Sequence, residues 1–219
     1  MSTELDHLVV AAATLEDGVR WCETTLGLTP APGGRHALMG THNRLLNLSS
    51  AAFPLCYLEI IAIDPEAPPP ERLRWYGLDD AALQAALRDQ GPRLIHTVAR
   101  TTILEPHRLA LLNQGIKMGE PMALHRDTPK GRLNWRILVR SDGRLELGGI
   151  VPTLMQWDSA HPADALPDQG AALTALRLDG LPVGVRDVLR LQGVAGDPDA
   201  PRRIVATLDT PRGPVTLSS

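Results

Sequence analysis

An internal repeat of the order strand, helix, strand, strand, strand most constrains how this chain can fold. The first copy begins with a compact apolar run at residues 5–13, continues with a helix that Thr14 can cap, and ends with a strongly apolar strand at residues 55–63. The second copy begins with a strand at residues 94–101 and ends with one at residues 151–157. The chain therefore predicts two similar βαβββ modules that share one core.

Turn and helix signals place the remaining elements of each copy. In the first copy, two prolines and two glycines predict a break at residues 30–34, followed by short strands at residues 37–39 and 44–48. In the second copy, Pro106 opens the helix, and alternating apolar residues predict a half-buried strand at residues 133–140.

The boundaries of these patterns divide the chain into four segments. We expect a first βαβββ module over residues 1–65 and a Pro-rich linker over residues 66–93. The linker includes a short helix through Gln90 that Asp79 and Asp80 can cap. A second βαβββ module is expected over residues 94–165, and a partial third βαββ unit, packed on the same domain, over residues 166–219. The predicted fold class is α+β, with the two modules forming a half-open mixed β-barrel that encloses a cleft.

Charge and hydropathy exclude several kinds of partner. The formal net charge of −3 gives no basic surface for nucleic acid or anionic membrane, and no run approaches the apolar length that a membrane span needs. Residues 1–10 show no signal peptide, and two cysteines, Cys22 and Cys56, do not make a disulfide framework. We expect a cytoplasmic protein, monomeric or homodimeric, that binds a small-molecule substrate or ligand.

Four polar residues fall at equivalent positions when the two copies are laid on each other. The LDH and LIH triplets align His7 with His96, and the YLE and LMQ triplets align Glu59 with Gln156. Glu59 and Gln156 are further apart in the sequence than His7 and His96 are, and a longer hairpin around residues 127–132 can absorb the difference. His7 and Glu59 each interrupt an otherwise apolar strand, where an unpaired polar group is costly to bury.

Two imidazoles, one carboxylate and one amide oxygen form a set that a divalent metal accepts, with positions left for water or substrate. Simpler explanations exist for each residue. His7 and His96 could be core histidines that donate to backbone carbonyls, and Glu59 could face solvent or pair with an arginine such as Arg44. Gln156 could bond to backbone at a strand edge.

Five further residues are candidates to line a substrate pocket. His42 and Asn43 either stabilise a hairpin turn or hydrogen-bond a substrate at the mouth of the cleft. Trp75 and Tyr76 either cap an apolar pocket or hold the linker in place. Arg136 is either a solvated strand residue or an anchor for an anionic substrate group.

Several motifs resemble the glyoxalase-like domain family of the vicinal oxygen chelate superfamily, which includes glyoxalases, bleomycin-resistance proteins and dioxygenases. They are the LDHLVVA opening, THN at residues 41–43, YLEII at residues 57–61 and MQWD…HPAD within residues 155–164. The resemblance covers about residues 5–165. It implies paired βαβββ modules around a divalent metal, and carried over by position the metal ligands are His7, Glu59, His96 and Gln156.

One departure from the family pattern bears on the reaction. Glyoxalase-type isomerases usually keep a carboxylate at the last ligand position, where this chain has Gln156, which cannot act as a base. Glu59 would then be both a ligand and the catalytic base. The resemblance implies a lyase, isomerase or oxygenase that depends on Zn, Ni, Mn or Fe(II) and acts on a small organic molecule. The alternative is a metal-free module that sequesters a small ligand in the same cleft.

Overall fold

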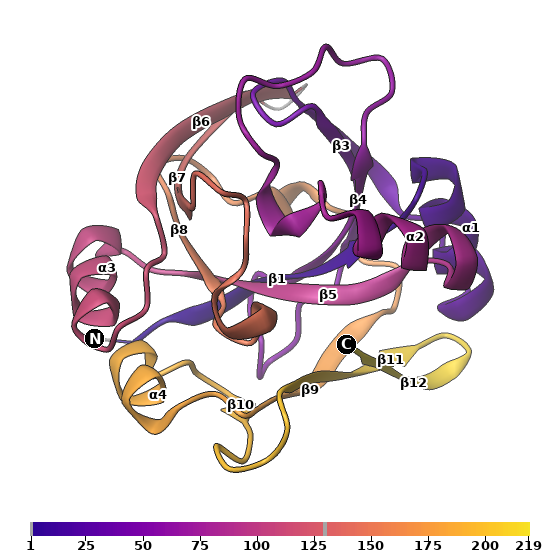
Figure 1. Ribbon diagram of the computed structural model, residues 1–219. Coiled ribbons are helices and arrows are strands. Elements are labelled where there is room, and N and C mark those ends of the chain that lie inside the picture. Colours follow the sequence, from indigo (N-terminus) through magenta and orange to yellow (C-terminus); the bar gives the residue numbers. More distant parts are fainter. Residues whose placement is uncertain (1, 129–130) are drawn as a thin grey trace.

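A computed structural model describes residues 2–128 and 131–219 of the chain. Its central feature is a curled eight-stranded sheet in the order β2-β3-β4-β1-β5-β8-β7-β6 (Figure 1). The strands are β1 (Glu4–Ala11), β2 (Ala31–His36), β3 (Thr41–Asn47), β4 (Tyr57–Ile63), β5 (Arg93–Arg100), β6 (Glu120–Thr128), β7 (Gly131–Val139) and β8 (Thr153–Trp157).

The two modules are joined through their first strands. β1 runs parallel to β4 and β5 runs parallel to β8, whereas β1 and β5 pair antiparallel at the centre of the sheet. At the two edges, β2 and β6 approach each other, because Arg126 of β6 lies against Gly34 of β2. The predicted α+β fold, with two βαβββ modules and a curled mixed sheet, is confirmed. The tip of the hairpin that the sequence placed at residues 127–132 falls partly on residues 129–130, outside the described residues.

The helices other than the one in the linker cover the outer face of the curled sheet. In α1 (Leu15–Thr25), the Thr14 hydroxyl accepts a hydrogen bond from the Asp17 N–H at 3.1 Å, so the predicted cap is confirmed. The other helices are α2 (Ala81–Gln90) in the linker, α3 (Leu104–Asn113) in the second module, and α4 (Val183–Leu189). Leu8 and Leu58 of the sheet lie with Cys22 of α1 in one fully buried cluster.

The C-terminal segment forms a second sheet in the order β10-β9-β11-β12, beside β5 in Figure 1. Its strands are β9 (Ala172–Asp179), β10 (Val194–Ala195), β11 (Arg203–Thr210) and β12 (Gly213–Ser218). Leu176 and Ile204 of this sheet belong to the same buried cluster as Leu8 of β1. The second sheet therefore packs on the outer face of the first, and its short β10 extends the predicted βαββ order.

Part of the first module differs from the sequence prediction. Residues 30–34, expected to break the chain, contribute to β2, and residues 37–39, expected as a strand, belong to the turn before β3. Prolines are tolerated here because β2 is an edge strand whose pairing with β3 shifts register between Pro32 and Arg35. His42 and Asn43 consequently lie within β3 and not in the turn.

The linker covers the inner, concave face of the curled sheet. A short 3-10 turn, Trp75–Gly77, places two stacked aromatic rings there, with centroids 5.4 Å apart. Tyr76 has a φ of 59°, which a non-glycine residue adopts only at a cost, and a hydrogen bond from Gly77 N–H to Gly143 O at 2.9 Å holds the turn in place. The predicted linker helix is α2, which Asp80 caps as expected.

Candidate active site

A bulge in β1 creates the most unusual part of the concave face. Leu5 pairs with Ala99 and His7 pairs with Val98, which leaves Asp6 as an extra residue between two ladder positions. Neighbouring residues of a regular strand point to opposite faces, and a bulge relaxes this rule. The Asp6 carboxylate can therefore lie beside the ring of its neighbour, with Oδ1 at 2.7 Å from His7 Nδ1.

Asp6 is fully buried and accepts hydrogen bonds from three side chains. Besides His7, Trp157 Nε1–H donates to Oδ2 at 2.8 Å and His161 Nε2–H donates to the same oxygen at 3.0 Å. His161 has its proton on Nε2, because Nδ1 accepts from the Ala163 N–H at 3.1 Å. Burial alone would raise the pKa of Asp6, but the hydrogen bonds from His161 and His7 outweigh it and hold that pKa well below its usual value. Asp6 is therefore an anion.

The Asp6 anion fixes the orientation of His7. Since Nδ1–H donates to Asp6, Nε2 carries the lone pair of the neutral ring, and Tyr57 stacks on that ring at a centroid distance of 4.6 Å. His7 Nε2 lies 3.6 Å from Glu59 Oε2. Among the described residues neither atom has a hydrogen-bond partner, although both are buried. An imidazole nitrogen and a carboxylate oxygen thus face each other without a hydrogen-bond partner in the described chain.

The other carboxylate oxygen of Glu59 is held in place. Asn43 Nδ2–H donates to Glu59 Oε1 at 2.6 Å. Asn43 is itself oriented, because its Oδ1 accepts from the Gly34 N–H at 2.8 Å and from Arg126 Nη1–H at 3.4 Å. Glu59 is 5% exposed, and so Asn43 leaves only Oε2 free to act on a bound molecule.

These side chains line a small cavity of about 40 Å³ on the concave face. Aromatic, imidazole and aliphatic groups form its walls, which are built from His7, His36, Asn43, Leu45, Tyr57, Glu59, Trp75, Tyr76, Arg126, Trp135, Ile137, Met155, Trp157 and Pro162.

His96 does not face His7 as a free ligand. Its Nδ1–H donates to Gly149 O at 2.9 Å, and its Nε2 accepts from Thr153 N–H at 3.1 Å and from the Thr153 hydroxyl at 2.9 Å. Burial lowers the pKa of His96 to about 4, which keeps the ring neutral. His96 is the hydrogen-bonded core histidine that the sequence left open as the simpler explanation.

The strand register corrects the alignment of the two copies. In the antiparallel ladder of β1 and β5, His7 pairs with Val98 and Val9 pairs with His96. These symmetric pairs place His7 and His96 at equivalent positions of the two modules, as the sequence alignment predicted. In the parallel ladders, however, Val9 pairs with Glu59 whereas Val98 pairs with Thr153. Thr153, which hydrogen-bonds His96, is therefore the counterpart of Glu59.

The match of Glu59 with Gln156 was wrong. Met155 lines the cavity, and Gln156, its neighbour on the strand, directs Oε1 away from it to accept from the Leu104 N–H at the start of α3, at 3.2 Å.

The expected four-ligand metal site does not fit these contacts. Both ring nitrogens of His96 are used by the protein, and the Gln156 amide bonds to backbone outside the cavity. Within residues 2–128 and 131–219, no group of three or more His, Cys, Asp or Glu side chains is arranged to hold a metal ion. Of the four predicted ligands, only His7 and Glu59 keep an atom without a hydrogen-bond partner among the described residues. These atoms, Nε2 of His7 and Oε2 of Glu59, face each other.

The remaining predicted pocket residues divide into two groups. Asn43, Trp75 and Tyr76 line the cavity. Arg136 forms a half-exposed ion pair with Asp158 at 2.8 Å. His42, on the opposite face of β3 from Asn43, lies 3.9 Å from an oxygen of Asp64.

Three functional candidates were not predicted as site residues: Asp6, Arg126 and His161. Two of them stand in motifs that carried the family resemblance, LDH and HPAD, but no local pattern indicates that these motifs meet.

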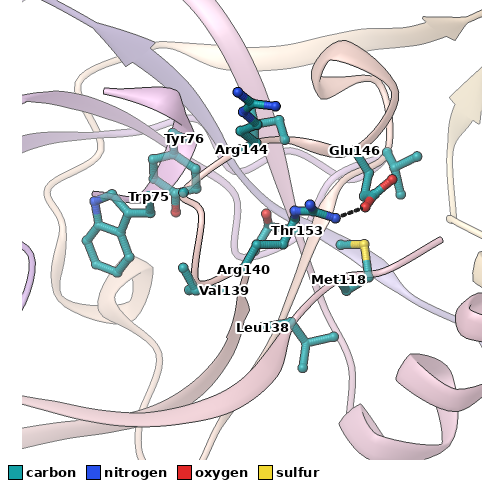
Figure 2. Close-up of a pocket in the computed structure, with 12 residues that line it drawn as sticks. Trp75, Tyr76, Met118, Leu138, Val139, Arg140, Arg144, Glu146 and Thr153 are labelled. Atoms are coloured by element: carbon teal, nitrogen blue, oxygen red, sulfur yellow. Dashed lines mark hydrogen bonds and ion pairs between the residues drawn. The ribbon is translucent and has the colours of Figure 1, made fainter. Parts of the chain in front are cut away.

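A second cavity adjoins the stacked aromatic pair (Figure 2). It is also lined by Trp75 and Tyr76, and Thr153 contributes to its wall. Arg140, a partly exposed cation in its wall, is neutralised by an ion pair with Glu146 and by another with Asp142. The second module thus presents satisfied polar groups where the first presents the free atoms of His7 and Glu59.

The low pKa of His96 predicts that acid destabilises the protein. The unfolded chain takes up a proton near pH 6.5, whereas folded His96 does so near pH 4, so stability is lost as the pH falls between these values. By pH 5 this histidine alone should cost about 2 kcal/mol of unfolding free energy. Urea unfolding across this range tests the prediction. His96→Gln should flatten the slope and His125→Gln, at an exposed residue, should not; a wild-type stability independent of pH would contradict it.

The curled two-module sheet with a polar pair on its concave face defines the class of glyoxalase-like proteins. The chain belongs to the glyoxalase-like domain family, whose family model matches residues 5–206. Among solved structures, a hypothetical protein from Staphylococcus aureus is similar over 81% of this chain and 69% of its own, with 16% identity and a TM-score of 0.54.

Methylmalonyl-CoA epimerases are also among the similar structures. The enzyme from Streptomyces coelicolor is 17% identical, over 73% of this chain and 96% of its own, with a TM-score of 0.42. The enzyme from Mycobacterium tuberculosis is 16% identical, over 74% and 91%, with a TM-score of 0.39. These likenesses concern the fold. A search of curated proteins finds no match. None of the helices in the described part of the chain is long and apolar enough to cross a membrane.

Proposed function

We propose that this protein is an isomerase that moves a proton at a carbon next to a carbonyl group of a small organic molecule. The observation that carries the proposal is the buried pair of His7 Nε2 and Glu59 Oε2, 3.6 Å apart, with no other partner among the described residues and open to the cavity. Buried groups of this kind that line a cavity are typical of general acid–base catalysis.

In the proposed reaction Glu59 Oε2 removes the proton, and the electron pair of the C–H bond forms the C=C bond of an enolate. Glu59 is then neutral, and it can pass the proton to His7 Nε2, because Asp6 stabilises the imidazolium that results. Return of a proton from this pair to the other face of the carbon, after the planar enolate has turned in the cavity, gives the epimer. Where that carbon carries a hydroxyl group, the intermediate is an enediolate, and return of the proton to the former carbonyl carbon makes the hydroxyl the new carbonyl. Atoms and charge balance without a further reactant.

The contacts of the second module support this reaction over one that depends on four metal ligands. Both ring nitrogens of His96 are hydrogen-bonded, to Gly149 and Thr153. The imidazole and carboxylate atoms that stay unpaired at the cavity are therefore those of His7 and Glu59. Asn43 adds support, because it holds one oxygen of Glu59 and leaves the other free.

The test is solvent exchange, which needs no knowledge of the final product. Chelator-treated protein in D₂O is incubated with a panel of small ketones, 2-oxo acids and thioesters, and proton NMR follows the loss of the C–H signal next to the carbonyl. We expect catalysed exchange for at least one member. If compounds bind in the cavity but none exchanges faster than in buffer, the isomerase is excluded and the ligand-binding module, which the aromatic walls also fit, is favoured.

A further inference from the structure

Arg126 is a cation in the cavity wall without an ion-pair partner among the described residues. Its Nη1–H donates a long hydrogen bond to Asn43 Oδ1, at 3.4 Å, and its buried Nε has no partner in the described chain. Two arginines of the adjacent strand β7 behave differently, because Arg132 pairs with Asp127 and Arg136 pairs with Asp158. The guanidinium N–H groups of Arg126 are therefore available to hydrogen-bond a bound molecule.

Trp75, which lines the same cavity, carries a second unsatisfied donor. The residue is 4% exposed, and its Nε1–H has no partner within the described residues. A buried N–H without an acceptor costs free energy comparable to a lost hydrogen bond. The neighbouring His36, edge-on to Trp75 at 4.9 Å, adds no competing charge, because burial and the nearby Arg126 lower its pKa to about 3.

We propose that Arg126 and Trp75 form a subsite for a carboxylate, so that the substrate is a small carbonyl compound that carries a carboxylate group. The guanidinium fork matches the two oxygens of a carboxylate, and the indole N–H can donate to one of them. The anion would satisfy donors that are otherwise buried and unpaired. The substrate assignment rests on the proposed function, whereas the subsite rests only on these contacts.

Binding of oxalate, a planar carboxylate, tests the subsite without turnover, with the uncharged oxamide as a ligand of the same shape. Calorimetry should show that the wild type binds oxalate at least about tenfold more tightly than oxamide. Arg126→Gln should weaken oxalate binding by about tenfold or more, Arg126→Lys by less, and Trp75→Phe by about threefold or more. The matched control Arg132→Gln removes an exposed, paired cation and should leave affinity within about twofold.

Equal oxalate affinity in the wild type and Arg126→Gln, or no oxalate binding by the wild type, overturns the subsite. Tighter binding of inorganic phosphate than of oxalate overturns the assignment to a carboxylate. The two proposals fail separately. Binding that depends on Arg126, without proton exchange on any member of the panel, removes the isomerase and keeps the subsite. Exchange on neutral ketones alone, without oxalate binding, keeps the isomerase and removes the subsite.

Discussion

Replacing Glu59 with glutamine is expected to slow catalysed proton exchange by about 10²- to 10⁴-fold. Glutamine has the shape of glutamate, and its amide oxygen can still accept the hydrogen bond from Asn43 Nδ2 that is 2.6 Å long in the wild type. The amide cannot take up a proton at neutral pH, so the step that forms the enolate loses its base. The exchange rate of the compound that the wild type turns over measures the effect.

Glu120→Gln is the matched control, because Glu120 is an exposed carboxylate of β6 outside the cavity. It should leave the exchange rate within about twofold of the wild type. The unfolding midpoint of both variants shows whether they fold. A folded Glu59→Gln protein with the wild-type exchange rate would show that Glu59 is not the base.

Replacing Asp6 with asparagine should cost about 3–5 kcal/mol of unfolding free energy. The carboxylate is fully buried and accepts hydrogen bonds from His7, Trp157 and His161. The NH₂ group of asparagine would face at least one of these N–H donors and leave it without an acceptor. Loss of the anion would also remove the group that holds the proton of His7 on Nδ1. Urea unfolding measures the first effect, and imidazole NMR of His7 measures the second.

The control for this variant is Asp158→Asn, which changes a half-exposed carboxylate paired only with Arg136. It should change stability by less than about 1 kcal/mol. If Asp6→Asn were as mild as this control, the cluster around Asp6 would not be a structural support of the site.

Much of the fold could be predicted because its signals are local. The apolar runs of β1 and β4, the Thr14 cap and the Asp80 cap each act within a few residues, and all of them lie where the pattern placed them. The strand β2 was missed, because prolines and glycines are typical of a loop and only its edge position makes them tolerable.

Half of the candidate site followed from a single argument. His7 and Glu59 each interrupt an apolar strand, and the structure brings both to one cavity. Gln156 was a false match, because a three-residue likeness cannot fix a strand register, and the ladder shows that Thr153 takes that position.

Asp6 could not be predicted as a partner of His7, because regular alternation places neighbours on opposite faces. The bulge that relaxes this rule depends on pairing with β5, and the contacts of Asp6 with Trp157 and His161 join segments far apart in the sequence. Such contacts leave no local pattern.

The most direct test of the His7–Glu59 pair is the metal dependence of solvent exchange. The rate of deuterium incorporation by chelator-treated wild type is compared with the rate after addition of Zn, Ni, Mn or Fe(II). If the pair acts without a metal, the rates should agree within about twofold. An exchange that is absent from the chelated protein, returns with a metal and is lost again in His96→Gln would contradict the acid–base pair and restore the metal site.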